Sequence, residues 1–211
     1  MLEIKNEKLS IPVVVFAGLL WSFGPLVVRN MDDPGLIPWQ YLFARGLVIF
    51  FLLNIYLFFE EGIEFYKNYL KIGIAGIIGG VGLGTAMITF IWSITNTSAA
   101  ITLLCLSAMP FITALLGFLF LKEKIRPSVW VAIFVASIGV AIMAFDSVSI
   151  GSLNGLIYGL ASALGFSIFS VSLRWRKETP KFTTVAVAGL FCCLFSILIF
   201  IQKDLNFLSS S

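Results

Sequence analysis

The chain has 211 residues, of which 59% are hydrophobic and 12% are charged, and it carries a formal net charge of +3 with a mean hydropathy of +1.03. So little charged surface argues against a water-soluble domain and predicts a membrane protein. The sequence has no histidine, and no acidic residue falls well inside an apolar stretch, which argues against intramembrane proteolysis, a His-ligated metal site and an enzyme in general.

Seven apolar stretches, each long enough to cross roughly 30 Å of hydrocarbon as a helix, predict an all-α, polytopic transmembrane helix bundle. The connections between them are short and contain helix-breaking residues such as Pro34, Gly35 and Pro127, so no soluble domain fits between spans. In chain order the predicted spans cover residues 11–30, 37–59, 72–95, 98–121, 129–145, 155–173 and 183–201.

Basic residues gather on one side of the predicted membrane. The N-terminal tail and the second, fourth and sixth connections together hold 11 of the 14 Lys and Arg residues. Short cytoplasmic connections carry such an excess, so we expect a cytoplasmic N-terminus. Because every basic cluster adjoins a span, no nucleic-acid partner is expected, and the first apolar run is too long for a cleaved signal peptide.

The first span contributes two candidate solute-binding residues, Trp21 and Ser22. An indole near mid-span needs a partner for its N–H or a wet cavity. Pro25 removes a backbone donor and is expected to kink this helix. A packing kink and the opening of a central cavity stay open as alternatives.

Arg45, in the second span, is the strongest candidate for binding a solute. It lies about 12 Å below the predicted outer edge, at 1.5 Å per residue. A charge at that depth costs several kcal/mol unless it faces protein or water. It is expected to line a pathway for a carboxylate- or phosphate-bearing solute, the alternative being a structural Arg that binds helix-end carbonyls. Asn54, in the same span, is a weaker candidate.

The third span contains the small-residue spacing Gly76, Gly80 and Gly84, which predicts close helix packing. A phosphate-binding loop is rejected because no strand precedes these glycines and no Lys-Ser/Thr follows them. Trp92, near the outer end of this span, is a candidate for the solute site, with the aromatic belt at the membrane interface as the alternative. Trp39 and Trp130, near span starts, are interpreted as belt residues.

The later spans add Ser107 and Tyr158 to the candidate binding residues and Pro110 as a second kink. Ser107 has the alternative of bonding its own helix backbone, and Tyr158 that of belonging to the aromatic belt. The three cysteines lie inside spans and are interpreted as small apolar residues, with no disulfide framework.

Several stretches resemble the EamA-type branch of the drug/metabolite transporter superfamily. They are "FAGLLWSFGPLVVR" at 16–29, "LFARG" at 42–46, and "SAMPFITALLGFLFLKEK" followed by "VWVAIFVASIGVAIM". The resemblance implies a ten-helix carrier built from two five-helix repeats of opposite orientation, with both termini cytoplasmic.

On this resemblance, residues 11–145 form the first repeat and residues 155–201 a partial second repeat of two helices. An offset of 145 residues lays "LLWSFGPLVVR" over "LGFSIFSVSLR" and superposes two arginines at opposite helix ends, as an inverted repeat requires. The second repeat is shorter than the family's, which leaves two alternatives: a fragment of a longer protein, or a half-transporter that needs a second copy.

The sequence therefore predicts a carrier in a bacterial inner membrane that moves a small organic metabolite or amino-acid-like solute by alternating access. Its expected partners are that solute and membrane lipids, with no cofactor and no metal. The absence of a buried carboxylate favours exchange or facilitated diffusion over proton coupling. The alternatives are a flippase for a lipid-linked substrate and a non-transporting membrane scaffold.

Overall fold

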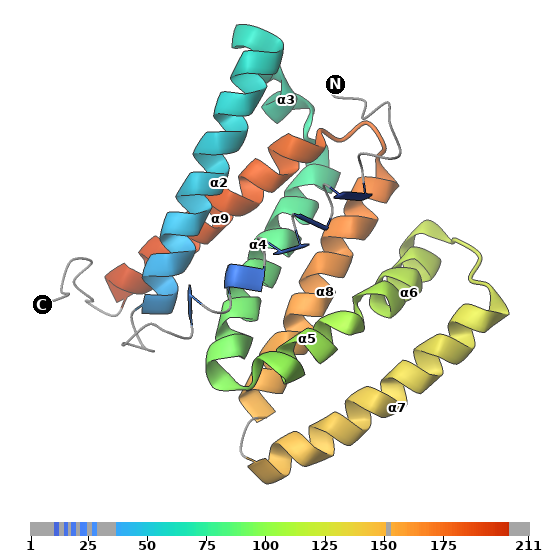
Figure 1. Ribbon diagram of the computed structural model, residues 1–211. Coiled ribbons are helices and arrows are strands. Elements are labelled where there is room, and N and C mark those ends of the chain that lie inside the picture. Colours follow the sequence, from blue (N-terminus) through green and yellow to red (C-terminus); the bar gives the residue numbers. More distant parts are fainter. Residues whose placement is uncertain are drawn as a thin grey trace, which may run out of the picture.

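The computed structural model describes residues 37–150 and 153–202, together with residues 11, 12, 15, 16, 18, 19, 22–24, 27 and 28 of the first predicted span. Over these residues the chain consists of helices joined by short connections (Figure 1). The helices are α2 (Ile37–Glu61), η1 (Gly62–Phe65), α3 (Tyr66–Lys71), α4 (Gly73–Asn96), α5 (Ala99–Ser107), α6 (Met109–Leu121), α7 (Pro127–Ile150), α8 (Leu153–Trp175) and α9 (Lys181–Gln202).

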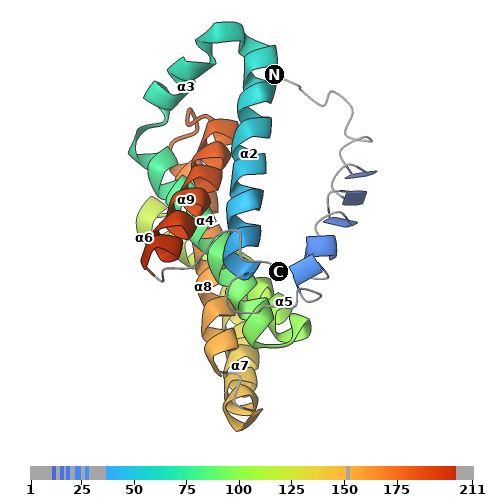
Figure 2. The ribbon, with the colours of Figure 1, turned by 90° about the vertical axis from the view of Figure 1, so that its left-hand side faces the viewer.

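The predicted spans from the second to the seventh each coincide with helix in the structure. Five segments of the described chain are long and apolar enough to cross a membrane; they contain α2, α4, α5 with α6, α8 and α9. A shorter apolar segment, Pro127–Gly139, belongs to α7. The prediction of an all-α polytopic membrane bundle is confirmed. The second connection is itself helical, since η1 and α3 arch from the end of α2 back to α4 (Figure 2).

Helix α4 lies at the centre of the bundle, between α8 on one side and α9 on the other (Figure 1). Its glycines are divided between these two neighbours. A Cβ atom added to Gly82 would lie 3.1 Å from the carbonyl oxygen of Gly165 in α8. A Cβ atom added to Gly84 would lie 2.6 Å from the ring of Phe191 in α9. Close helix approach in a bilayer requires such small residues, because a larger side chain would force the backbones apart.

The glycine spacing predicted from the sequence covers one of these two faces. Gly80 and Gly84 contact α9, and Gly76 lies beside Thr179 in the connection that leads into α9. Gly79 and Gly82, which face α8, form a second small-residue stripe that the spacing of four residues did not include.

Buried hydroxyl groups add directional bonds where α4 meets α8. The Ser162 hydroxyl donates to the Ala86 carbonyl at 2.9 Å, and the Ser93 hydroxyl donates to the Gly155 carbonyl at 2.8 Å. Both serines are fully buried. Hydrogen bonds of this kind between transmembrane helices typically contribute about 0.6 kcal/mol each, so they fix the register of the pair more than its stability.

Helices α2 and α9 run antiparallel and also meet through glycines. A Cβ atom added to Gly46 would lie 2.6 Å from the Gly189 carbonyl oxygen. The Cys193 thiol donates to the Phe43 carbonyl at 3.5 Å, and the Cys192 thiol donates to the Gly84 carbonyl at 3.5 Å. All three cysteines are free and buried, as the sequence analysis expected.

The second, fourth and sixth connections meet at one end of the bundle, which we call the basic end. Arg174 forms an ion pair with Glu123, and the guanidinium of Arg176 lies beside Gly73. Thr97 and Gly155 pack together at the opposite end. The structure thus brings these three Lys- and Arg-rich connections to one side, as the sequence indicated.

The fourth predicted span is interrupted at one residue, Ala108, which lies two residues before Pro110, the position of the predicted kink. Helix α5 ends at Ser107, α6 begins at Met109, and the amide groups of Phe111 and Ile112 both donate to the Ala108 carbonyl, at 3.1 and 3.0 Å. Pro110, in the first turn of α6, has no amide proton to continue the α5 pattern. The Ser167 hydroxyl of α8 donates to the Met109 carbonyl at 3.1 Å, which satisfies a backbone group beside the break.

We predict that Gly165→Ala destabilises the protein. Its new Cβ atom would lie 2.6 Å from the Gly82 carbonyl oxygen and 2.9 Å from the Cβ atom of Ala86, so α8 must move away from α4. The expected loss is about 1–3 kcal/mol, which lowers the Tm in detergent by several degrees.

Gly139→Ala is the matched control, because no atom lies within 4 Å of the position its Cβ would take. It is expected to leave the Tm unchanged or to raise it, since alanine is the better helix former by up to about 1 kcal/mol. Equal Tm values for the two variants would show that the approach of α4 and α8 does not limit stability.

Candidate functional site

The binding residues predicted from the sequence do not form one cluster. Trp21 and Pro25 lie outside the described residues. The Ser22 hydroxyl donates to the Leu19 carbonyl at 2.6 Å, and the Ser107 hydroxyl donates to the Leu104 carbonyl at 2.6 Å. Both serines are exposed on their helices and bond their own backbone.

Asn54 has a local structural role. Its side-chain amide donates to the Phe50 carbonyl at 2.7 Å, and its carbonyl oxygen accepts from the Tyr69 hydroxyl at 2.8 Å. These bonds tie α3 back to α2 near the basic end. Both polar atoms of the Asn54 amide are therefore already engaged.

Trp92 and Tyr158, by contrast, are brought together. Trp92 of α4 lies between Trp39 of α2, with ring centroids 5.2 Å apart, and Tyr158 of α8, at 6.4 Å. Phe195 of α9 lies 5.7 Å from Trp39 and 6.0 Å from Phe191. We call these five residues the aromatic cluster. It lies at the end of the bundle opposite the basic end, and four helices contribute to it.

Three polar groups at this level are buried and lack a partner. They are the indole N–H groups of Trp39 and Trp92 and the hydroxyl of Ser196, none of which reaches a hydrogen-bond partner in the described part of the chain. Trp39 is 5% exposed and Ser196 is 0% exposed. A buried unsatisfied polar group costs about 1–3 kcal/mol of stability. Three of them at one level therefore call for a ligand or water that accepts hydrogen bonds from them.

The register of α2 against α9 places Ser196 beside the cluster. Gly46 lies opposite Gly189, and the Phe43 carbonyl accepts a hydrogen bond from the Cys193 thiol. Because the two helices are antiparallel, a residue earlier in α2 faces a residue later in α9. Ser196 therefore lies at the level of Trp39, as the ring contact of its neighbour Phe195 with Trp39 also requires.

Arg45 lies six residues beyond Trp39 on α2, about 9 Å further along the helix axis. The side chain is partly buried, and its positive charge is near enough to act on the Cys192 thiol of α9. No ion pair or hydrogen bond joins Arg45 to any residue that the structure describes. A cation with no partner among the described residues thus lies one to two turns below the indole donors, an arrangement that favours an anionic group between them.

The donors and rings of this site suit a small amphipathic molecule. A carboxylate can accept from indole N–H and guanidinium groups, while aromatic faces accommodate an apolar group or an ammonium. Within the described ranges, no three His, Cys, Asp or Glu side chains lie close enough to hold a metal ion.

Trp39 is the member of the site that the sequence analysis misplaced, because it assigned this residue to the interfacial belt. The side chain is instead buried against α4 and α9. The signal that could have identified it is its spacing from Leu42 and Gly46, three and seven residues later, which places all three on the packed face of α2. Trp130 is 43% exposed and contacts Phe118 edge-on at 5.6 Å, as a lipid-facing residue would.

Comparisons with known proteins identify related sequences. Residues 8–145 match the EamA-like transporter family. Two uncharacterized transporters from strains of Helicobacter pylori are 28% and 27% identical, over 86% and 95% of this chain and 60% and 67% of their own length. An uncharacterized transporter from Pseudomonas aeruginosa is 33% identical over 71% of this chain and 50% of its own length. The chain thus spans between half and about two thirds of the relatives it matches, and no solved structure matches it.

We predict that Ser196→Ala leaves the stability of the solute-free protein unchanged or raises it by about 1 kcal/mol. The substitution removes a buried hydroxyl that has no partner among the described residues and hardly changes the side-chain volume. Thermal unfolding in detergent measures the effect.

Ser162→Ala is the matched control, because this serine is equally buried but donates to the Ala86 carbonyl at 2.9 Å. Its loss is expected to cost about 1 kcal/mol. If Ser196→Ala were the more damaging of the two, the Ser196 hydroxyl would have a partner inside the protein, and the site would lose one of its open groups.

Proposed function

The chain belongs to the EamA-like transporter family, within the drug/metabolite transporter superfamily, and we propose that it carries a small amino-acid-like solute across a membrane by alternating access. The observation that carries this proposal is the aromatic cluster, where two buried indole N–H groups lie near an arginine, and neither these groups nor the arginine has a partner among the described residues. Such groups lower the stability of the empty protein and gain their partners only when a solute binds.

The chemistry of these groups favours a solute with a carboxylate. In the proposed complex the carboxylate accepts from the indole N–H groups of Trp39 and Trp92 and faces the charge of Arg45, while the rings of Tyr158 and Phe195 contact the remainder of the solute. Trp39, Trp92 and Arg45 belong to the predicted first repeat, and Tyr158 and Phe195 belong to the predicted partial second repeat. This division into repeats stays a prediction. A site between two repeats is the arrangement that alternating access requires.

The basic end supplies a candidate gate for this cycle. The ion pair between Glu123 and Arg174 ties the end of α6 to the end of α8. A Cβ atom at position 117 would lie 2.7 Å from the Glu123 carboxylate and 2.9 Å from the Arg174 guanidinium, so Gly117 leaves the room that the pair occupies. We propose that this contact holds the basic end closed and separates when the solute leaves on that side.

The proposed setting is a bacterial inner membrane with the basic end in the cytoplasm, supported by the excess of Lys and Arg at that end and by the bacterial sources of the relatives. No acidic residue of the sequence falls well inside a predicted span. This supports exchange or facilitated diffusion over coupling to protons through a carboxylate.

The proposal is tested by counterflow in proteoliposomes with labelled amino acids, with the corresponding amines that lack a carboxylate, and with the carboxylates that lack an amine. Solutes with a carboxylate are expected to exchange and the amines are not. Trp39→Phe, Trp92→Phe and Arg45→Gln should each raise the half-saturation concentration roughly 10- to 100-fold, because each removes a hydrogen bond or ion pair to a charged group.

Trp130→Phe serves as the control, since this exposed indole lies on α7 away from the cluster. It should behave as the unsubstituted protein does. Transport that is equally fast for amines and for amino acids, or unaffected by all three cluster substitutions, would overturn the proposed site.

The gate makes a separate prediction. Glu123→Gln should increase the rate at which a membrane-impermeant thiol reagent, added at the basic end, modifies the native Cys192 and Cys193. The expected increase is up to about fivefold, because a half-exposed ion pair contributes up to about 1 kcal/mol. The double exchange Glu123→Arg with Arg174→Glu should restore slow labelling. Labelling of the exchanged protein as fast as that of Glu123→Gln would contradict the gate.

A further inference from the structure

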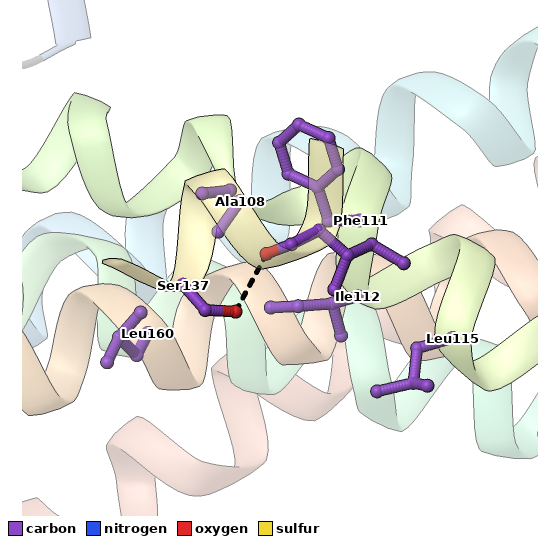
Figure 3. A pocket seen from close by; sticks show the side chains of 8 residues that line it. Ala108, Phe111, Ile112, Leu115, Ser137 and Leu160 are labelled. Carbon is purple, nitrogen blue, oxygen red and sulfur yellow. Dashed lines mark hydrogen bonds between the residues drawn. The ribbon is translucent and has the colours of Figure 1, made fainter. Parts of the chain in front are cut away.

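A cavity lies away from the aromatic cluster, between α6, α7 and α8, and has a volume of about 250 Å³ (Figure 3). Four of its lining residues, Ala108, Phe111, Ile112 and Leu115, come from α6 and the segment that precedes it. None of the binding residues predicted from the sequence lines it.

The lining of this cavity offers no polar group for a solute. Ser137 of α7 is its one polar side chain, and its hydroxyl already donates to the Ile133 carbonyl at 2.8 Å (Figure 3). A polar metabolite would lose its hydration there without gaining hydrogen bonds. A hydrocarbon chain would lose nothing, because it exchanges lipid contacts for protein contacts of the same kind.

The cavity is open on one side and lies within reach of the basic end. Leu115 is six residues before the end of α6, and Ile133 is six residues after the start of α7, so each lies about 9 Å from the helix end. An acyl chain that descends from the lipid headgroup level at that end covers this depth. The cavity thus lies within the length of one phospholipid from the α6–α7 connection.

The connection above the cavity is positively charged. Lys122, Lys124 and Arg126 are exposed, and no ion pair joins them to another residue in the described part of the chain. Glu123, the acidic residue among them, is engaged by Arg174. Three cations over an apolar cavity are complementary to the phosphate and the acyl chain of one anionic phospholipid.

We propose that this cavity binds an acyl chain of an anionic phospholipid whose headgroup lies on Lys122, Lys124 and Arg126. The lipid fills the space between α6 and α7, and α7 otherwise contacts the bundle through α6 and α8 (Figure 1). Its outer face, with Phe134 and Val135 each more than 60% exposed, meets ordinary bilayer lipid. The bound lipid thereby holds α7 against the rest of the protein.

The test is native mass spectrometry of the full chain, released from detergent that contains equal amounts of phosphatidylglycerol and phosphatidylcholine. One phosphatidylglycerol should be retained in preference to phosphatidylcholine. Lys124→Gln with Arg126→Gln should reduce this preference about 25-fold, because each basic residue near a headgroup contributes about fivefold to the attraction of anionic lipid. The control is Lys177→Gln with Lys181→Gln, an equal loss of exposed charge at the same end, which should keep the preference.

A cavity-filling variant examines the acyl chain. Ala136 lines the cavity, so Ala136→Leu should abolish retention, whereas Ala141→Leu makes the same change at an exposed position of the same helix and should not. The proposal is overturned by equal retention of the two lipids, by retention that survives Ala136→Leu, or by a lipid-free dimer that Ala136→Leu dissociates, which would make a second copy the occupant. The variant Lys124→Gln with Arg126→Gln leaves the cavity unchanged, so its lipid preference tests the proposal even if Ala136→Leu does not fold.

Discussion

The packing of α4 between α8 and α9 is the constraint on which the rest of the structure depends. Hydrocarbon surrounds the bundle, so apolar burial does not drive its helices together as it does in water, and association relies on close backbone contact and a few hydrogen bonds. Gly82 and Gly84 face different neighbours, which lets one helix approach two others at once. The loss of either face would separate the helices that carry the candidate site.

The glycines of α4 also explain where that site lies. They run from Gly73 to Gly84 and then stop, and the remainder of the helix toward the opposite end carries large side chains such as Phe90 and Trp92. Small residues therefore bring α4 against both neighbours near the basic end, whereas aromatic rings fill the space between α2, α4 and α9 at the other. Trp39 and Trp92 contact each other with ring centroids 5.2 Å apart, and their N–H groups have no acceptors among the described residues.

The aromatic cluster and the cavity between α6, α7 and α8 differ in the kind of ligand that their chemistry suits. The aromatic cluster joins buried donors to a nearby cation and suits a charged solute, whereas the space between α6 and α7 is hydrocarbon beneath a basic connection and suits a lipid. Transport requires the aromatic cluster to be open to one side of the membrane and then to the other during the cycle. A lipid in the cavity between α6, α7 and α8 would stay bound and would set how firmly α7 is held against α6 and α8. Ala108, where α5 and α6 are separated, is one of the residues that line the cavity between α6, α7 and α8.

Hydropathy by itself determined the helices, their order and the common side of the basic connections, because a bilayer imposes a fixed length on every span and a charge bias on every loop. It also singled out Trp92, Tyr158 and Arg45, since polar and aromatic groups at span depth are rare. Only the tertiary structure showed that Trp39 joins them, that Asn54 and Ser107 are bonded locally, and that the fourth span is broken at Ala108. Those outcomes depend on which face of each helix meets which neighbour, and that is decided by contacts between residues far apart in the chain.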